Sequence, residues 1–160
     1  MNKVRLIGLG NEWTGDDAVG LKVAQALLPL KTEDFDVLVL GVPDYQMFEG
    51  LGKDDQLIVV DACKGGGEVG SIIKLTLDEL STQYPADLIR HGSSHGLGLQ
   101  HWLSMAKTLD GISCEILIYG IEIGQTEMGV ALSPEVEEAV STLAAQLKQT
   151  YAKAAELNHA

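Results

Sequence analysis

The chain has 160 residues, of which 46% are hydrophobic, so it can bury the core of one ordinary domain, and a single domain over residues 1–160 is expected. Its formal net charge of −12 would repel phosphate backbones and anionic lipids, which argues against nucleic acid and membrane surfaces as partners. Two cysteines are too few for a disulfide framework, and together with the lack of a signal peptide or a long apolar run they predict a cytoplasmic protein.

Short β-branched runs alternate along the chain with segments of helical period, a pattern typical of helices that cover a mostly parallel sheet. The expected strands cover residues 4–8, 36–40, 57–60 (ending at Asp61), 71–75 and 115–121. Three helices are expected. The first follows Asp17 and stops by Pro29, the second covers residues 97–109, and the third starts at Ser133-Pro134 near the end of the chain.

The glycine turn at residues 65–67 is long enough only for a tight reversal. Residues 71–75 are therefore expected to pair antiparallel at or near an edge of the sheet. The predicted fold is α/β, a three-layer sandwich in which helices flank a twisted, mostly parallel five-stranded sheet with one antiparallel strand.

A polar cluster follows the first expected strand, at the edge of the sheet where ligands bind in such folds. Gly8 and Gly10 match the start of a dinucleotide fingerprint, but Trp13 stands at the third glycine position. Asp16 and Asp17 would repel phosphate at the helix start and attract a cation, so no nucleotide is expected. The same two acids could instead cap the helix that follows and favour its dipole.

Two further candidates fall near the same edge. Asp61 closes an apolar strand, where its carboxylate must reach the cleft, find a partner or cap the next loop. His95 lies just before an expected helix and could be a ligand, a structural residue or an exposed one, whereas His91 is discounted as a ligand. Asp17, Asp61 and His95 together would form an incomplete shell for a divalent metal, open to water or substrate.

The order and spacing of these motifs resemble those of a known family. The motifs are Gly8-x-Gly10-Asn11 with Asp16-Asp17 and Gly20, then Val59-Val60-Asp61-Ala62, then Ser93-Ser94-His95, extended by residues 119–122 and 132–136. This set resembles the nickel-iron hydrogenase maturation endopeptidases over nearly the whole chain. The resemblance implies cytoplasmic removal of a C-terminal extension from the hydrogenase large-subunit precursor after nickel insertion. It also implies that Asp17, Asp61 and His95 contact the metal and form the catalytic site.

Two carboxylates and one imidazole bind transition metals weakly, so the nickel is expected to arrive with the precursor, held mainly by the precursor's own thiolates. Peptide hydrolysis needs an activated water, for which Asp17 or Asp61 could be the general base. Cys63 could add a soft ligand or be a small buried hydrophobe, and Glu122 is also well placed. The sequence leaves the roles of Cys63, Glu122 and Asp16 open.

The sequence allows two alternatives to a metal-dependent endopeptidase. The segment from Gly92 to Gly96 has the form of a serine nucleophile elbow around Ser94, but no strand precedes it and the later histidines, His101 and His159, are poorly placed. The other alternative is a non-enzymatic nickel-binding accessory protein that docks on the precursor, because the same three ligands would serve binding alone.

Overall fold

The carboxyl ends of four parallel strands meet at one edge of a single sheet in the computed structural model, which describes residues 2–83, 89–90, 99, 103–104, 107–108 and 113–158. The sheet order is β2-β1-β3-β6-β4, with the short β5 paired to β3. The parallel strands are β1 (Val4–Gly8), β2 (Phe35–Val39), β3 (Gln56–Cys63) and β6 (Glu115–Glu122). Two strands run antiparallel to their neighbours, β4 (Ile72–Thr76) beside β6 and β5 (Ile89–Arg90) beside β3.

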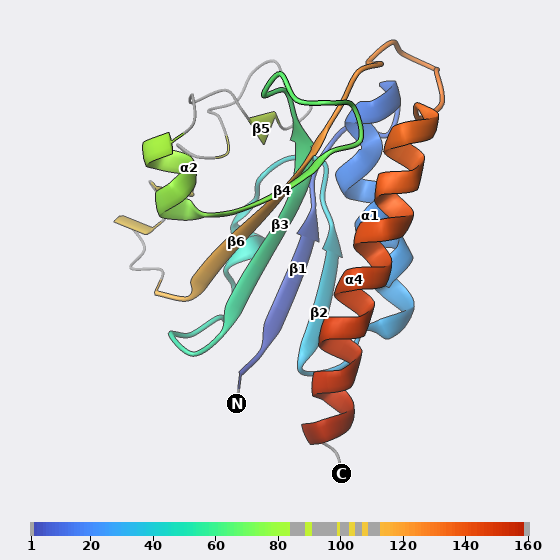
Figure 1. Ribbon diagram of the computed structural model, residues 1–160. Helices are drawn as coiled ribbons and strands as arrows, with labels where there is room; N and C mark the ends of the chain where they lie inside the picture. Colours follow the sequence, from blue (N-terminus) through green and yellow to red (C-terminus); the bar gives the residue numbers. More distant parts are fainter. Residues whose placement is uncertain are drawn as a thin grey trace.

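Helices cover both faces of this sheet (Figure 1). On one face, α1 (Val19–Leu27) packs against the long α4 (Pro134–Asn158). The opposite face carries α2 (Leu77–Gln83) and the 3-10 turn η3 (Tyr45–Met47). Two further 3-10 turns, η1 (Gly15–Ala18) and η2 (Leu28–Leu30), flank α1. In the part of the chain that the structure describes, no helix is both long and apolar enough to cross a bilayer.

The alternation of side chains along β3 explains why helices are needed on both faces. Leu57 and Val59 enter the core on the α2 side, whereas Ile58 and Val60 enter the core beneath α1 and α4, and all four are fully buried. A strand that is apolar on both faces is stable only when both are covered. Burying one such side chain stabilises the fold by about 1.5–3 kcal/mol.

The structure confirms the predicted α/β architecture and the antiparallel edge strand after the glycine turn. The expectation that no strand precedes the segment from Gly92 to Gly96 is wrong, because the two-residue strand β5 (Ile89–Arg90) pairs with β3 shortly before it. The prediction that the central strand ends at Asp61 is wrong, because β3 stays paired with β6 as far as the Cys63–Glu122 register, so Asp61 lies inside the strand. Most of the helix expected over residues 97–109 lies outside the described residues, although Leu99 and Leu103 are helical and fully buried.

The short helix α2 is absent from the sequence-based prediction, although the sequence carries a signal for it. The Glu79 amide donates to the Thr76 hydroxyl, and the Thr76 amide donates to Glu79 Oε1, both at 3.1 Å. This reciprocal pair is a capping box, which satisfies free N–H groups at the start of the helix. A threonine followed three residues later by glutamate therefore predicts α2.

Candidate functional site

Glycines after β1 allow the first helix to approach the carboxyl edge of the sheet closely. A Cβ atom on Gly20 would lie 2.3 Å from the carbonyl oxygens of both Leu9 and Val60. A Cβ atom on Gly10, whose φ is +144°, would lie 2.1 Å from the Asp17 carbonyl oxygen. Any side chain at these positions would push η1 and α1 away from the strands. The glycines of the first motif therefore determine where Asp17 lies relative to the sheet.

Asp61 is a fully buried carboxyl group in β3. Its register partner in β6 is Gly120, which places no side chain beside it. Asp61 Oδ1 accepts a hydrogen bond of 2.8 Å from the Ala62 amide, but Oδ2 has no hydrogen-bond partner among the residues that the structure describes. A buried polar atom without a partner is costly, and such atoms in native proteins often meet a ligand, an ion or water.

The electrostatic environment of Asp61 disfavours its ionised form. Burial raises the pKa of the Asp61 carboxyl well above its ordinary value, the Ala62 hydrogen bond opposes this rise, and the negative charge of Asp17 adds to it. A cation between the two carboxylates would relieve both the desolvation and the repulsion.

Asp17 lies in η1 on the loop that follows β1 and is partly exposed. Its Oδ2 accepts a weak hydrogen bond of 3.5 Å from the Thr14 hydroxyl. The turn η1 packs against β3, and the charge of Asp17 contributes to the raised pKa of Asp61, so these two sequence-predicted site residues lie near each other. Both lie at the carboxyl edge of the parallel strands, where α/β folds bind their ligands.

The third predicted site residue, His95, lies outside the described residues, as do Ser93 and Ser94. The last described residue before this segment is Arg90, which pairs with Ala62 next to Asp61.

Asp16 has a different role from that of its neighbour Asp17. Its fully buried carboxylate accepts hydrogen bonds from the amides of Gly124 (3.0 Å), Gln125 (2.7 Å) and Ser133 (2.6 Å) and from the Ser133 hydroxyl (2.7 Å). Burial raises its pKa, but these hydrogen bonds outweigh burial and lower the pKa overall. Asp16 thus ties η1 to the segment before α4, and its carboxylate is engaged there instead of capping α1.

Glu122 and Cys63 form a closed cluster two residues beyond Asp61. Glu122 accepts hydrogen bonds from the amides of Gly65 (2.9 Å) and Gly66 (3.0 Å) and from the Cys63 thiol (3.4 Å). Burial and the Glu122 carboxylate raise the pKa of the Cys63 thiol. A protonated, buried thiol is a poor metal ligand, so the structure favours the small-hydrophobe interpretation of Cys63. Glu122 holds the turn after β3.

The donor set suits a cation only in combination with further ligands. Within the described ranges, no three His, Cys, Asp or Glu side chains are close enough together to hold a metal ion. Asp17 and Asp61 supply hard oxygen donors, and the unpartnered Oδ2 of Asp61 fits a role as one of them. The remaining ligands would have to come from outside the described residues or from a substrate.

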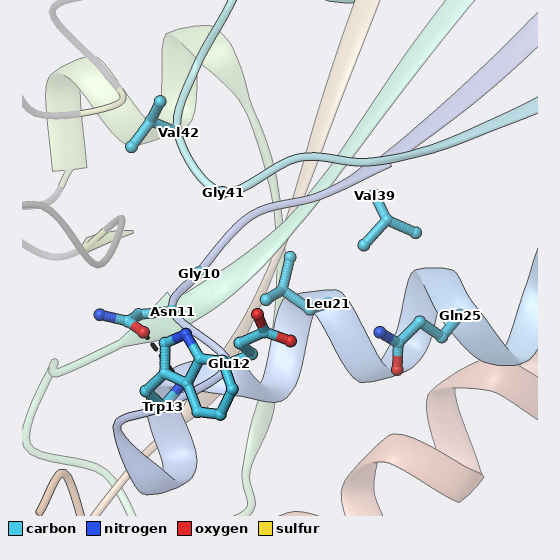
Figure 2. Close-up of a pocket in the computed structure, with 9 residues that line it drawn as sticks. All are labelled: Gly10, Asn11, Glu12, Trp13, Leu21, Gln25, Val39, Gly41 and Val42. Atoms are coloured by element: carbon cyan, nitrogen blue, oxygen red, sulfur yellow. Dashed lines mark hydrogen bonds between the residues drawn. The ribbon is translucent and has the colours of Figure 1, made fainter. Parts of the chain in front are cut away.

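A cavity of about 380 Å³ opens between the loop after β1 and the end of β2 (Figure 2). Leu21 and Gln25 of α1 form part of its wall, and Glu12, Trp13 and Val42 stand at the loops around it. Its volume falls within the usual range for ligand pockets. In the sequence, Trp13 stands out only as a mismatch to the dinucleotide fingerprint, and no local pattern marks it as a residue that lines a cavity.

The chain is similar to several hydrogenase maturation proteases. A family model described as hydrogenase maturation protease matches residues 24–150. The chain is 23% identical over 140 residues to hydrogenase 2 maturation protease of Escherichia coli K12, covering 86% of this chain and 84% of that protein. It resembles the crystal structure of the nickel-iron hydrogenase maturation protease HycI from Thermococcus kodakarensis KOD1, with a TM-score of 0.75, 30% identity, and coverage of 92% and 91% of the two chains. For the hydrogenase maturating endopeptidase HybD of Escherichia coli, the TM-score is 0.72 at 21% identity, with 95% and 93% covered.

Proposed function

Because the chain belongs to the hydrogenase maturation protease family, we propose that it removes the C-terminal extension of a nickel-loaded nickel-iron hydrogenase large-subunit precursor. The observation that carries this proposal is the buried, unpartnered Oδ2 of Asp61 beside the charge of Asp17. Such an arrangement is stable only when a proton or a cation joins it, and nickel in the precursor would supply the cation.

In this proposal, Asp17, Asp61 and His95 contact the nickel that the precursor carries. A role for His95 beside Asp17 and Asp61 follows from the family resemblance of the Ser93-Ser94-His95 motif. Two carboxylates and one imidazole make a weak and unselective site on their own. Most of the affinity for nickel would therefore belong to the thiolates of the precursor, and the protease would act only after nickel had been inserted.

The residues of this chain would then position the scissile bond and accept a proton from the attacking water. Contact between the carboxylates and the nickel of the precursor would fix the extension at the carboxyl edge, which favours attack on one peptide bond. Asp17 is the more exposed acid and can accept a proton from the attacking water. Asp61 lies inside the paired strand β3, and its contact with the nickel would hold the precursor in a fixed position relative to Asp17.

The proposed site of action is the cytoplasm. Both cysteines, Cys63 and Cys114, are free and buried, which fits a reducing compartment.

Incubation of the purified protein with nickel-loaded precursor tests this function, followed by the intact mass of the precursor and of any released peptide. Release of a single C-terminal peptide by the wild-type chain, and none by Asp61→Asn, would support the proposal. Stable binding without any change of mass would favour the nickel-binding accessory protein instead.

A further inference from the structure

Large apolar side chains on the surface are concentrated at the edge that holds Asp17 and Asp61. Among the described residues, seven large hydrophobic side chains are exposed, and only Leu28 of η2 lies outside the loops that follow β1, β2, β3 and β6. The other six are Trp13, Val42, Tyr45, Val69, Met128 and Val130. This edge lies at the top of the sheet in Figure 1, away from both termini. Exposed hydrophobic side chains gathered in one region mark an interaction surface more often than scattered ones do.

Four of these side chains lie on the loops after β1, β2 and β6, and we call them the apolar rim: Trp13, Val42, Met128 and Val130. Trp13 and Val42 line the same 380 Å³ cavity (Figure 2). The Gly129 amide donates a 2.7 Å hydrogen bond to the Trp13 carbonyl, which fixes the loop of Met128 beside that of Trp13. Trp13 is 66% exposed and Met128 is 78% exposed.

The charges on the same loops are mainly negative. Exposed acidic residues lie next to the residues of the apolar rim in the sequence: Glu12 precedes Trp13, Asp44 follows Val42 by two residues, and Glu127 precedes Met128. The described parts of the loops that follow β1, β2, β3 and β6 carry two basic residues, Lys64 on the connection after β3 and Lys53 close to the start of β3. A complementary surface would therefore be apolar at its centre with basic side chains at its margin.

We propose that the apolar rim docks the folded body of the hydrogenase large-subunit precursor, through an apolar patch with basic side chains around it. This inference rests on the proposed function, because a substrate that brings its C-terminal extension to Asp17 and Asp61 must meet the loops at this edge. Trp and Met are enriched at interfaces, and a small number of such anchors carries most of the binding energy.

The test measures the affinity of the full-length chain for full-length, nickel-loaded precursor by biolayer interferometry. All variants carry Asp61→Asn so that the precursor stays intact during the measurement. Trp13→Ala and Met128→Ala should each raise the dissociation constant about tenfold. Leu28→Ala, on the opposite side of the molecule, should change it less than about twofold. Glu12→Gln with Glu127→Gln should lower the association rate and reduce its dependence on salt.

Circular dichroism of each variant verifies that it is folded, and Val42→Asp provides an independent disruption of the apolar rim. An unchanged dissociation constant for the folded Trp13, Met128 and Val42 variants would overturn the docking proposal. Loss of self-association on Trp13→Ala without weaker precursor binding would also overturn it, because the apolar rim would then join two copies of this chain. Failure of the proposed function is a separate result, since wild-type protein would then bind the precursor without releasing a peptide.

Discussion

Asp61 is fully buried in β3, and the negative charge of Asp17 adds to that burial in raising the pKa of its carboxyl group. The single hydrogen bond from Ala62 opposes the shift without reversing it. Burial and the charge of Asp17 therefore destabilise the ionised form of Asp61 until a positive charge joins the two carboxyl groups. This relationship leads to predictions about stability as well as about activity.

Without metal, Asp61→Asn should change how stability depends on pH. Because the folded protein holds the Asp61 proton more tightly than the unfolded chain does, the contribution of Asp61 to stability falls as pH rises from about 3.8 through the raised pKa. Each tenfold difference in proton affinity between the folded and unfolded states corresponds to about 1.4 kcal/mol. Asparagine has no such proton to lose, so the Tm of the variant minus that of the wild type should increase as pH rises. Parallel Tm profiles from pH 4 to pH 8 would show that Asp61 is not perturbed.

Substitution of the two adjacent acids should separate folding from activity. Asp16→Asn weakens four hydrogen bonds to a charged group and should lower the free energy of unfolding by about 2–4 kcal/mol. Since its pKa is lowered in the folded state, the stabilisation from Asp16 is present above pH 3.8 and is lost as pH falls through the folded pKa. Asp17→Asn should cost less than about 1 kcal/mol but abolish processing. Urea unfolding and the processing assay measure both effects, and equal destabilisation by the two variants would contradict this assignment.

The close approach of α1 to the strands should make Gly20 intolerant of a side chain. Gly20→Ala places a Cβ atom 2.3 Å from two backbone carbonyl oxygens, so it should destabilise the fold by about 2–3 kcal/mol or more. Gly67→Ala is the matched control because nothing lies within 4 Å of its Cβ atom, and it should change stability by less than about 0.5 kcal/mol. Denaturant midpoints that differ little between the two variants would refute the packing argument.

The sequence was sufficient to predict the sheet and the edge where Asp17 and Asp61 lie, because strand ends and helix starts carry strong local signals. It could not assign different roles to Asp16 and Asp17, since both have the same chemistry and the contact that distinguishes them is with Ser133, 117 positions away. The enclosure of Glu122 likewise depends on the register between β3 and β6, which no local pattern encodes.

Substitutions in the segment after Arg90 should distinguish the proposed site from a serine hydrolase. His95→Ala should leave the protein folded and abolish release of the C-terminal peptide, because it removes a proposed ligand of the nickel. Ser94→Ala should keep substantial activity, since the serine is expected to do no more than cap a helix, worth about 1 kcal/mol. A folded but inactive Ser94→Ala protein would instead favour nucleophilic catalysis by that hydroxyl.

The most direct test of the central claim compares nickel-loaded and nickel-free precursor as substrates for metal-stripped enzyme, with the mass of the released peptide followed over time. If the carboxylates of Asp17 and Asp61 act on nickel that the precursor carries, only the loaded precursor should be cleaved. Addition of divalent metal to the enzyme alone should not replace it, because two carboxylates and one histidine bind transition metals weakly. Equal rates of cleavage for the two precursors would contradict the account, even though the chain would still be a protease.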